Sequence, residues 1–277
     1  MPSRARAETA RPLRACRAAL GTPSASSGLS ASRGGEAKIF PDPSIETCGS
    51  SPLSVVIPAL DAADTLPAAL AALEEGRTSG LLREVIVVDG GSGDATAALA
   101  RAGGARVLAA PRGRGLQLAA GGAAAAGAWL FFLHADTRLA RGWSQAVGAF
   151  IAAPANRRRA GYLRLRLDDE SRAARRIEAA VRWRCRALAL PYGDQGLLLS
   201  AALYRELGGF RTLPLMEDVD LARRLGRGRL AALAADAVTS ATRYRRDGYV
   251  ARPLRNLCCL ALYFLGVPPR LLLRLYR

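Results

Sequence analysis

The stretch of sequence that decides the fold is Leu130-Phe131-Phe132-Leu133-His134-Ala135-Asp136-Thr137. The first four residues are all apolar, and a short, more polar segment follows them directly. An apolar run without alternation is typical of a strand buried on both faces in a parallel sheet. Ligands of open α/β sheets bind outside the carboxyl ends of the strands, and Asp136 stands at such an end. This aspartate could therefore belong to a metal or phosphate site, or it could simply cap the next turn.

Apolar runs alternate with helical segments on the amino-terminal side of this stretch. Three further strands are expected at residues 53–58, 84–89 and 105–108. A helix capped by Asp64 and Thr65, with Pro67 in its first turn, should run to about Glu75. Another helix should follow the loop at residues 90–96, and an Ala/Gly-rich helix should precede Leu130. This order predicts an α/β fold with a doubly wound, mainly parallel sheet flanked by helices.

The pattern after Arg141 is less regular. Apolar and basic residues alternate at residues 163–167, which is typical of a strand with one solvent-exposed face. Residues 171–190 form a basic amphipathic pattern typical of a helix. A polar loop is expected at residues 193–196, and a helix at residues 219–225.

The C-terminal stretch at residues 257–275 is apolar, but Pro268 and Pro269 interrupt it. Its unbroken apolar part, residues 257–267, is too short to span a bilayer. The stretch could lie on an anionic membrane surface with its arginines outward, or it could dock on the core of the domain itself.

Composition narrows the functional classes. The chain of 277 residues has a formal net charge of +17, which attracts nucleic acid, anionic lipid or phosphorylated small molecules without choosing among them. No RNA-recognition or helix-turn-helix signature accompanies the charge, so we expect no specific nucleic-acid partner. The five cysteines form no Cys-x-x-Cys pair, which argues against a zinc site or a disulfide framework and for a reducing compartment. His134 is the only histidine, which excludes a multi-histidine metal site.

Residues 1–50 lack periodicity and are rich in Ser, Ala, Gly, Pro and Arg. We predict that they are a disordered, low-complexity extension, although their composition also resembles that of a transit peptide. The expected organisation is therefore an extension at residues 1–50, an α/β domain at residues 51–245 and a basic, apolar helical tail at residues 246–277.

Three acidic residues fall at expected loop ends, namely Asp89, Asp136 and Asp218. Carboxylates at strand ends can hydrogen-bond a base or ribose, or can hold a hard divalent cation through oxygen. Three of them in one α/β framework point to a nucleotide or metal site.

Four motifs in order along the chain resemble the signatures of family 2 glycosyltransferases, which have the GT-A fold. They are Val55-Val56-Ile57-Pro58-Ala59-Leu60-Asp61, Val87-Val88-Asp89-Gly90-Gly91-Ser92-Gly93-Asp94, Phe132-Leu133-His134-Ala135-Asp136-Thr137 and Met216-Glu217-Asp218. The resemblance covers residues 53 to about 244. Two more motifs, at residues 112–117 and 192–196, resemble a bacterial subgroup of such transferases with His-Ala-Asp-Thr in place of Asp-x-Asp.

The resemblance implies a role for each matching residue. The nucleotide-sugar subsite would comprise Pro58, Leu60, Asp89, Gly90, Arg112, Arg114 and Ala135. Asp136 would bind Mg²⁺ or Mn²⁺ at the sugar-nucleotide diphosphate, and Asp218 would be the general base that deprotonates the acceptor hydroxyl. Asp194, Gln195 and Glu217 would shape the acceptor pocket.

These roles suit the chemistry of glycosyl transfer. A divalent cation neutralises the charge that develops on the diphosphate leaving group, and the two arginines could add charge-assisted hydrogen bonds to it. A carboxylate on the opposite face would take the acceptor's proton, which gives inversion in a single displacement. Purely structural roles are the alternatives to these functional ones. Arg112 and Arg114 could lie in a solvent-exposed loop, and Asp194 and Gln195 could form an ordinary turn.

The sequence departs from the family pattern at two places. His134 replaces the first aspartate of Asp-x-Asp, so the protein supplies one carboxylate to the cation, with His134 as an outer orienting group or an ordinary strand-end residue. Asp61-Ala62 stands where many relatives have Asn-Glu.

We therefore predict an inverting glycosyltransferase that moves a sugar from a nucleoside-diphosphate donor to a hydroxyl acceptor, which could be lipid-linked. A cytoplasmic location is expected, with contact at the inner face of the membrane as an option. Alternatives are an inert nucleotide- or lipid-binding protein on the same scaffold, and a sugar nucleotidyltransferase. The latter would need a long glycine-rich phosphate loop after the first strand, which Pro58-Ala59-Leu60-Asp61 does not supply.

Overall fold

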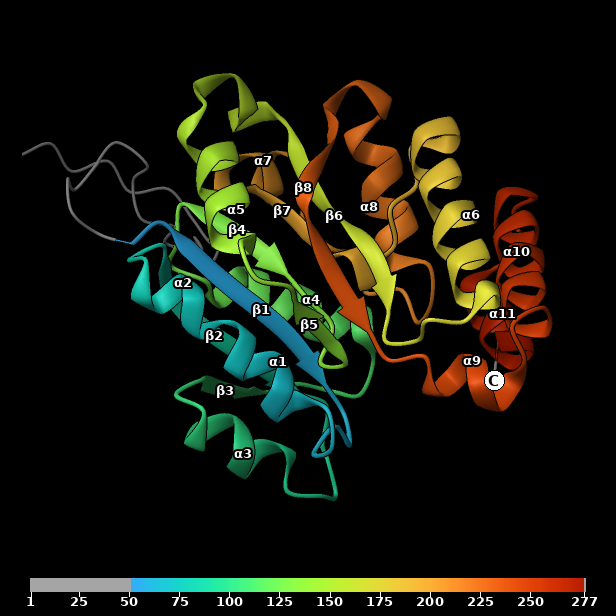
Figure 1. The fold of residues 1–277 in the computed structure, drawn as a ribbon, viewed down its shortest axis with the longest axis horizontal. Helices are drawn as coiled ribbons and strands as arrows, with labels where there is room; N and C mark the ends of the chain where they lie inside the picture. Colours follow the sequence, from blue (N-terminus) through green and yellow to red (C-terminus); the bar gives the residue numbers. More distant parts are fainter. Residues whose placement is uncertain (1–50, 277) are drawn as a thin grey trace, which may run out of the picture. The chain divides into compact units, whose positions relative to one another are not determined.

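The computed structural model describes residues 51–276, and the predictions made for residues 1–50 fall outside this range. Within the described residues the chain forms one mixed sheet with helices on both faces (Figure 1). The strands, in chain order, are β1 (Leu53–Ala59), β2 (Leu82–Asp89), β3 (Arg106–Ala109), β4 (Trp129–Phe132), β5 (Thr137–Leu139), β6 (Ala160–Leu167), β7 (Leu197–Ser200) and β8 (Leu230–Thr239).

The sheet has the strand order β3-β2-β1-β4-β7-β6-β8-β5. Its first four strands are parallel, with β1 between β2 and β4, which confirms the doubly wound arrangement predicted for the amino-terminal half. In the other half, β6 and β8 are parallel while β7 and β5 run antiparallel to their neighbours. The expectation of a mainly parallel α/β sheet is confirmed.

Helices cover the two faces of this sheet. They are α1 (Leu66–Ala72), α2 (Glu74–Thr78), α3 (Thr96–Ala102), α4 (Arg114–Ala124), α5 (Trp143–Ala152), α6 (Arg172–Leu188), α7 (Ala201–Glu206), α8 (Glu217–Leu225), α9 (Thr242–Asp247), α10 (Ala251–Phe264) and α11 (Pro269–Tyr276). Short 3₁₀ turns occur at η1 (Pro154–Arg158), η2 (Gly193–Gln195) and η3 (Arg227–Arg229).

Strand β4 is buried on both faces, as its unbroken apolar run predicts. Phe131 packs into the core on the side of α1 and α5, together with Trp143 and Val147. Its neighbours Leu130 and Phe132 pack into the opposite core, on the side of α4, α7 and α8. The polar residues after Leu133 therefore follow a strand that is buried on both faces.

Helix α4 lies unusually close to the sheet. A Cβ built at Gly121 would collide with Val56 of β1 and would come within 2.9 Å of Val88 of β2. The Ala/Gly-rich composition of this helix thus serves close packing, because only a glycine at residue 121 leaves room for the β1 side chain.

The first helix differs from its prediction. Helix α1 ends at Ala72 and a separate helix, α2, begins at Glu74, where one helix to Glu75 was expected. Pro67 lies in the first turn as predicted, but the expected capping is wrong: Thr65 stands at the N-cap without a side-chain cap hydrogen bond. The loop before α1 is instead held by residues that follow the neighbouring strand β2. Thr96 Oγ1 and Asp94 Oδ2 accept hydrogen bonds from the N–H groups of residues 62 and 63.

The C-terminal helices α10 and α11 dock on the domain. Cys259, Leu260 and Leu272 pack with Met216 and Val219 in a shared apolar cluster, which confirms docking on the core. The outer side of the same helices keeps large apolar side chains exposed, namely Val250, Leu254, Leu257, Phe264, Leu265, Leu271 and Leu275. Among the described residues, no helix has the length and apolar character needed to cross a membrane.

Candidate functional site

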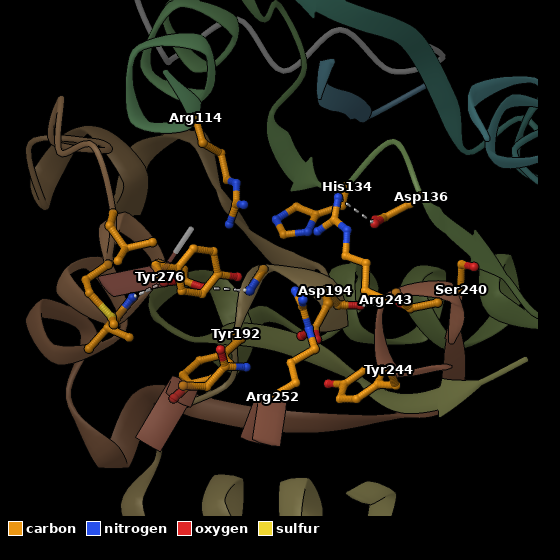
Figure 2. A pocket seen from close by; sticks show the side chains of 17 residues that line it. Arg114, His134, Asp136, Tyr192, Asp194, Ser240, Arg243, Tyr244, Arg252 and Tyr276 are labelled. Atoms are coloured by element: carbon orange, nitrogen blue, oxygen red, sulfur yellow. Dashed lines mark hydrogen bonds and ion pairs between the residues drawn. The ribbon is translucent and has the colours of Figure 1, made fainter. Parts of the chain in front are cut away.

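A cavity of about 110 Å³ lies beyond the carboxyl end of β4 (Figure 2). Arg114 of α4 and the segment His134 to Asp136 form one wall, and η2 and the start of α8 form another. The remaining wall comes from the loop after β8 and from α9, α10 and α11. The cavity therefore draws on most of the described chain, including the C-terminal helices that the sequence placed in a separate tail.

Asp136 stands at the mouth of this cavity, in the turn between β4 and β5. Its side chain is 22% exposed, and its Oδ2 lies 3.7 Å from Nη2 of Arg243. Within residues 51–276 no backbone N–H donates to this carboxylate, so Asp136 does not cap the turn, which is closed instead by the hydrogen bond from Thr137 N to His134 O. The structure thus favours the site interpretation of Asp136 over the capping one.

His134 lines the same wall and is packed against Gly193 of η2. A Cβ at residue 193 would collide with His134 Nε2, so the close contact requires glycine there. Burial, followed by the positive charge of Arg114, lowers the pKa of His134 to about 4, with Asp136 opposing the shift. The imidazole is therefore neutral at neutral pH and adds no charge beside Asp136.

Asp218 faces the cavity from the first turn of α8. Its Oδ2 accepts a hydrogen bond from Gly193 N at 2.9 Å, and its Oδ1 accepts one from Val219 N at 2.7 Å. The helix begins at Glu217, two residues before its predicted start, after Met216 takes a left-handed conformation with φ of 67°. Asp218 is therefore held at a helix N-terminus, where the N–H groups favour a carboxylate.

Glu217 does not line this cavity, but it pairs with Arg114, which does. Its side chain is only 1% exposed, and Oε1 lies 3.3 Å from Nη1 of Arg114. Burial raises the pKa of Glu217, while Arg114 opposes that shift. Burial lowers the pKa of Arg114, but the charge of Glu217 outweighs this and raises it above its ordinary value. The pair places a guanidinium at the cavity wall, whereas Arg112 is exposed and lies outside the cavity.

The predicted base subsite lies apart from this cavity, at the ends of β1 and β2. Asp89 accepts hydrogen bonds from Ser92, at 2.5 Å from Oγ. Gln117 of α4 holds the two strand ends together, because its Nε2 donates to Ala59 O at 2.7 Å and to Val88 O at 2.8 Å. Of the remaining predicted nucleotide residues, Gly90 and Ala135 are buried, while Pro58 and Leu60 are half-buried.

Asp61, at which the sequence departs from the family pattern, has a structural role. Asp61 Oδ1 accepts a hydrogen bond from Gly93 N at 2.8 Å, and Asp61 N donates to Ser92 Oγ at 3.0 Å. The loops after β1 and β2 are thereby tied to each other beside Asp89.

The two predicted acceptor residues in η2 differ in what they contact. Gln195 is buried and links elements: its Nε2 donates to Leu163 O at 3.0 Å, and its Oε1 accepts from Arg184 at 3.1 Å. Asp194 lines the cavity, and its Oδ1 is buried without a hydrogen-bond partner in the described chain. Burial raises the pKa of Asp194 to about 6, with Arg184 opposing and Asp218 reinforcing the shift.

The sequence reasoning missed the part of the cavity wall that α9 to α11 supply, namely Arg243, Tyr244, Arg252, Asn256 and Tyr276. Arg252 is held by Asp247, with 2.7 Å between Nη1 and Oδ2. Asn256 Oδ1 is buried without a partner in the described chain. No local pattern marks these residues, because only the docking of the C-terminal helices brings them to the site.

The residues present fit a divalent cation in one way only. Within residues 51–276 no group of three or more His, Cys, Asp or Glu side chains is placed to hold a metal ion. Asp136 offers one carboxylate, which is enough for Mg²⁺ or Mn²⁺ when phosphate and water oxygens complete the coordination. The donor set therefore suits a cation that arrives together with a diphosphate.

The family comparison agrees with the motifs around this site. Residues 54–160 match the family model described as "Glycosyl transferase family 2". Over these residues the chain is similar to glycosyl transferase family 2. The family 2 segment runs from β1 to the start of β6 and carries Asp89, Arg114 and Asp136, whereas Asp194 and Asp218 lie beyond it. The predicted GT-A arrangement, a mainly parallel sheet flanked by helices with a helical C-terminal tail, is the one described above.

Solved structures that match part of the chain include glucosyl-3-phosphoglycerate synthase from Mycobacterium tuberculosis. Its complex with Mn²⁺, UDP and glucosyl-3-phosphoglycerate is 24% identical over 68% of this chain and 70% of that chain, with a TM-score of 0.47. Its complex with Mn²⁺ and UDP-glucose is 23% identical over 68% of this chain and 69% of that chain, with a TM-score of 0.49. No curated protein matches the chain.

Proposed function

We propose that this protein is an inverting glycosyltransferase that moves a sugar from a nucleoside-diphosphate donor to a hydroxyl acceptor. The observation that carries the proposal is that Asp136 and Asp218, which are far apart in the sequence, line the same cavity. The family 2 match over residues 54–160 supports a nucleotide-sugar donor.

Donor binding would use the family 2 segment. The nucleotide would lie along the ends of β1 and β2, at Pro58, Leu60, Asp89 and Gly90, with its diphosphate near Ala135, Asp136 and Arg114, and with Arg112 at the rim. A divalent cation on Asp136 would neutralise the charge that develops on the diphosphate leaving group. Arg114 would add a positive charge there, since its pairing with the buried Glu217 keeps the guanidinium at the cavity wall.

Asp218 would act as the general base. Two backbone N–H groups, those of Gly193 and Val219, donate hydrogen bonds to its carboxylate and fix its direction. An acceptor hydroxyl bound in the cavity would pass its proton to Asp218 as its oxygen attacks the anomeric carbon of the sugar. The acceptor side also offers two unpartnered oxygens, Asp194 Oδ1 and Asn256 Oδ1, which suit hydroxyl donors on the acceptor.

We further propose that the C-terminal helices rest on an anionic membrane surface and bring the cavity to a lipid-linked acceptor. Helices α10 and α11 expose a row of large apolar side chains, and residues 250–276 contain arginines but no acidic residue. That combination matches the charge and apolarity of an anionic bilayer interface. The same helices supply Asn256 and Tyr276 to the cavity wall.

Calorimetry of the purified full chain tests the transferase proposal. UDP, GDP, dTDP and CDP would each be titrated with and without Mn²⁺, in the wild type and in Asp136→Ala. We expect one of the four to bind, to bind more tightly with Mn²⁺, and to lose the Mn²⁺ effect in Asp136→Ala. A well-folded wild type that binds none of them would contradict the proposal, and binding without sugar transfer would favour the inert scaffold.

A further inference from the structure

Among residues 51–276, Arg243 forms an ion pair with the proposed metal ligand Asp136, although it lies far beyond the family 2 segment. It is the second residue of α9, and its Nη2 lies 3.7 Å from Asp136 Oδ2 (Figure 2). Its side chain is 57% exposed, so the guanidinium can turn without unpacking the core. The helix itself is anchored, since Arg245 lies 3.6 Å from Asp168 and 3.5 Å from Asp169.

The two arginines at this wall differ in how firmly they are held. Arg114 is half-buried and pairs with the fully buried carboxylate of Glu217, with 3.3 Å between Nη1 and Oε1. Arg243 has Asp136 as its acidic partner, across a distance longer than a direct hydrogen bond. Arg114 and Arg243 both line the cavity wall together with His134 and Asp136.

We propose that Arg243 exchanges Asp136 for the donor diphosphate, and that this exchange makes the divalent cation and the diphosphate bind together. The inference rests on the transferase function proposed above and assigns to α9 a diphosphate-binding residue that the sequence did not reveal. In the free protein, Arg243 neutralises the one carboxylate that a cation needs. When a diphosphate arrives, its oxygens offer the guanidinium a stronger, charge-assisted set of acceptors and release Asp136 to the cation.

The physical reason is competition for one carboxylate. A divalent cation on Asp136 and a guanidinium within 4 Å of it repel each other unless further negative charge lies between them. A diphosphate supplies that charge. Each ligand therefore improves the site for the other, and the coupling must be the same in both directions.

The test is the variant Arg243→Ala, with two binding measurements made separately. The first measures, with EDTA present, the affinity for whichever of UDP, GDP, dTDP and CDP binds the wild type. We expect this affinity to weaken about tenfold, whereas affinity for the matching monophosphate, which lacks the second phosphate, changes little. The second measures Mn²⁺ alone by electron paramagnetic resonance, and we expect it to bind about threefold more tightly because Asp136 has lost its competitor.

Two variants control for simpler explanations. Arg246→Ala removes the same charge from the same helix, where Arg246 pairs with Asp247, and should move neither affinity. Arg243→Lys keeps a cation within reach and should recover most of the diphosphate affinity.

Opposite shifts for diphosphate and Mn²⁺ in Arg243→Ala support the proposal, because a purely structural role would weaken both. Unchanged affinities, or a loss of both, would overturn it. Failure of the transferase proposal shows differently, since the wild type itself would then bind none of the four nucleotides.

Discussion

Asp218 has two hydrogen bonds that a substitution can largely preserve. Asparagine keeps the size of the side chain and one acceptor oxygen, but it cannot take a proton at neutral pH. If Asp218 is the general base, Asp218→Asn should lower the rate of sugar transfer by about 10²–10⁴ while the nucleotide affinity stays within about twofold. Steady-state transfer assays beside calorimetry measure the two quantities, and an equal loss of both would mean that Asp218 binds the donor instead.

Asp194 makes a prediction about stability against pH. Its carboxyl has a pKa of 3.8 in the unfolded chain and about 6 in the fold, so the folded state disfavours its charged form. The resulting cost is absent below about pH 3.8, grows as the pH rises to about 6 and is then constant. Asp194→Asn should therefore raise the free energy of unfolding by about 1–3 kcal/mol near neutral pH.

Urea denaturation at about pH 4 and about pH 7.5 measures this effect. The gain from Asp194→Asn should nearly vanish at the lower pH, where the carboxyl is protonated in the fold and half-protonated in the unfolded chain. An equal gain at both values would show that the charge of Asp194 is not its cause.

At the level of elements, the contact between α4 and the sheet offers a matched pair of substitutions. Gly121→Ala places a methyl group on Val56 and should destabilise the protein by about 1–3 kcal/mol, because the helix must move away from β1. Gly148→Ala in α5 has open space around its new methyl group and should stabilise by about 0.5–1 kcal/mol through helix propensity. Chemical denaturation of both variants checks the opposite signs.

The elements that are best predicted from the sequence are those whose buried residues form a recognisable local hydrophobic pattern. The unbroken apolar runs that became β1, β2 and β4, and the amphipathic pattern of α6 capped by Ser171, were predicted within a few residues. The capping of the first helix was not, because Asp94 and Thr96 from another loop hold that segment. A hydrogen bond between two loops that are far apart in the sequence produces no periodic pattern from which it could be predicted.

The candidate site divides in the same way. The motifs place Asp136 and Asp218 at the ends of elements, and docking of the elements brings both to one cavity. Sequence could not place Arg243 or Asn256 there, since their position depends on how α9 and α10 pack against the loop after β8. It also grouped Arg112 with Arg114, although only the latter meets a buried carboxylate, Glu217.

On the scale of the whole molecule, the net charge of +17 and the exposed apolar residues of α10 and α11 predict binding to anionic vesicles. Full-length protein should sediment with vesicles containing phosphatidylserine, and less so as salt increases. Replacing Leu257 and Leu265 by serine should weaken this binding about tenfold or more, because each leucine buries apolar area in the interface. Neutral phosphatidylcholine vesicles are the control, and equal binding of variant and wild type would contradict the role of α10.

The cavity walls come from several separate segments between Arg114 and Tyr276. A bound ligand should therefore slow amide hydrogen exchange in several segments that are distant in the sequence. A ligand that fills the cavity opposes the local opening of every wall at once. Exchange should therefore slow together in α4, α8 and α10, which are distant in sequence, while α3, on the far side of β2 and β3, should keep its own rate. A donor and an acceptor would also leave distinct footprints, the first on the ends of β1 and β2 and the second on α9 to α11.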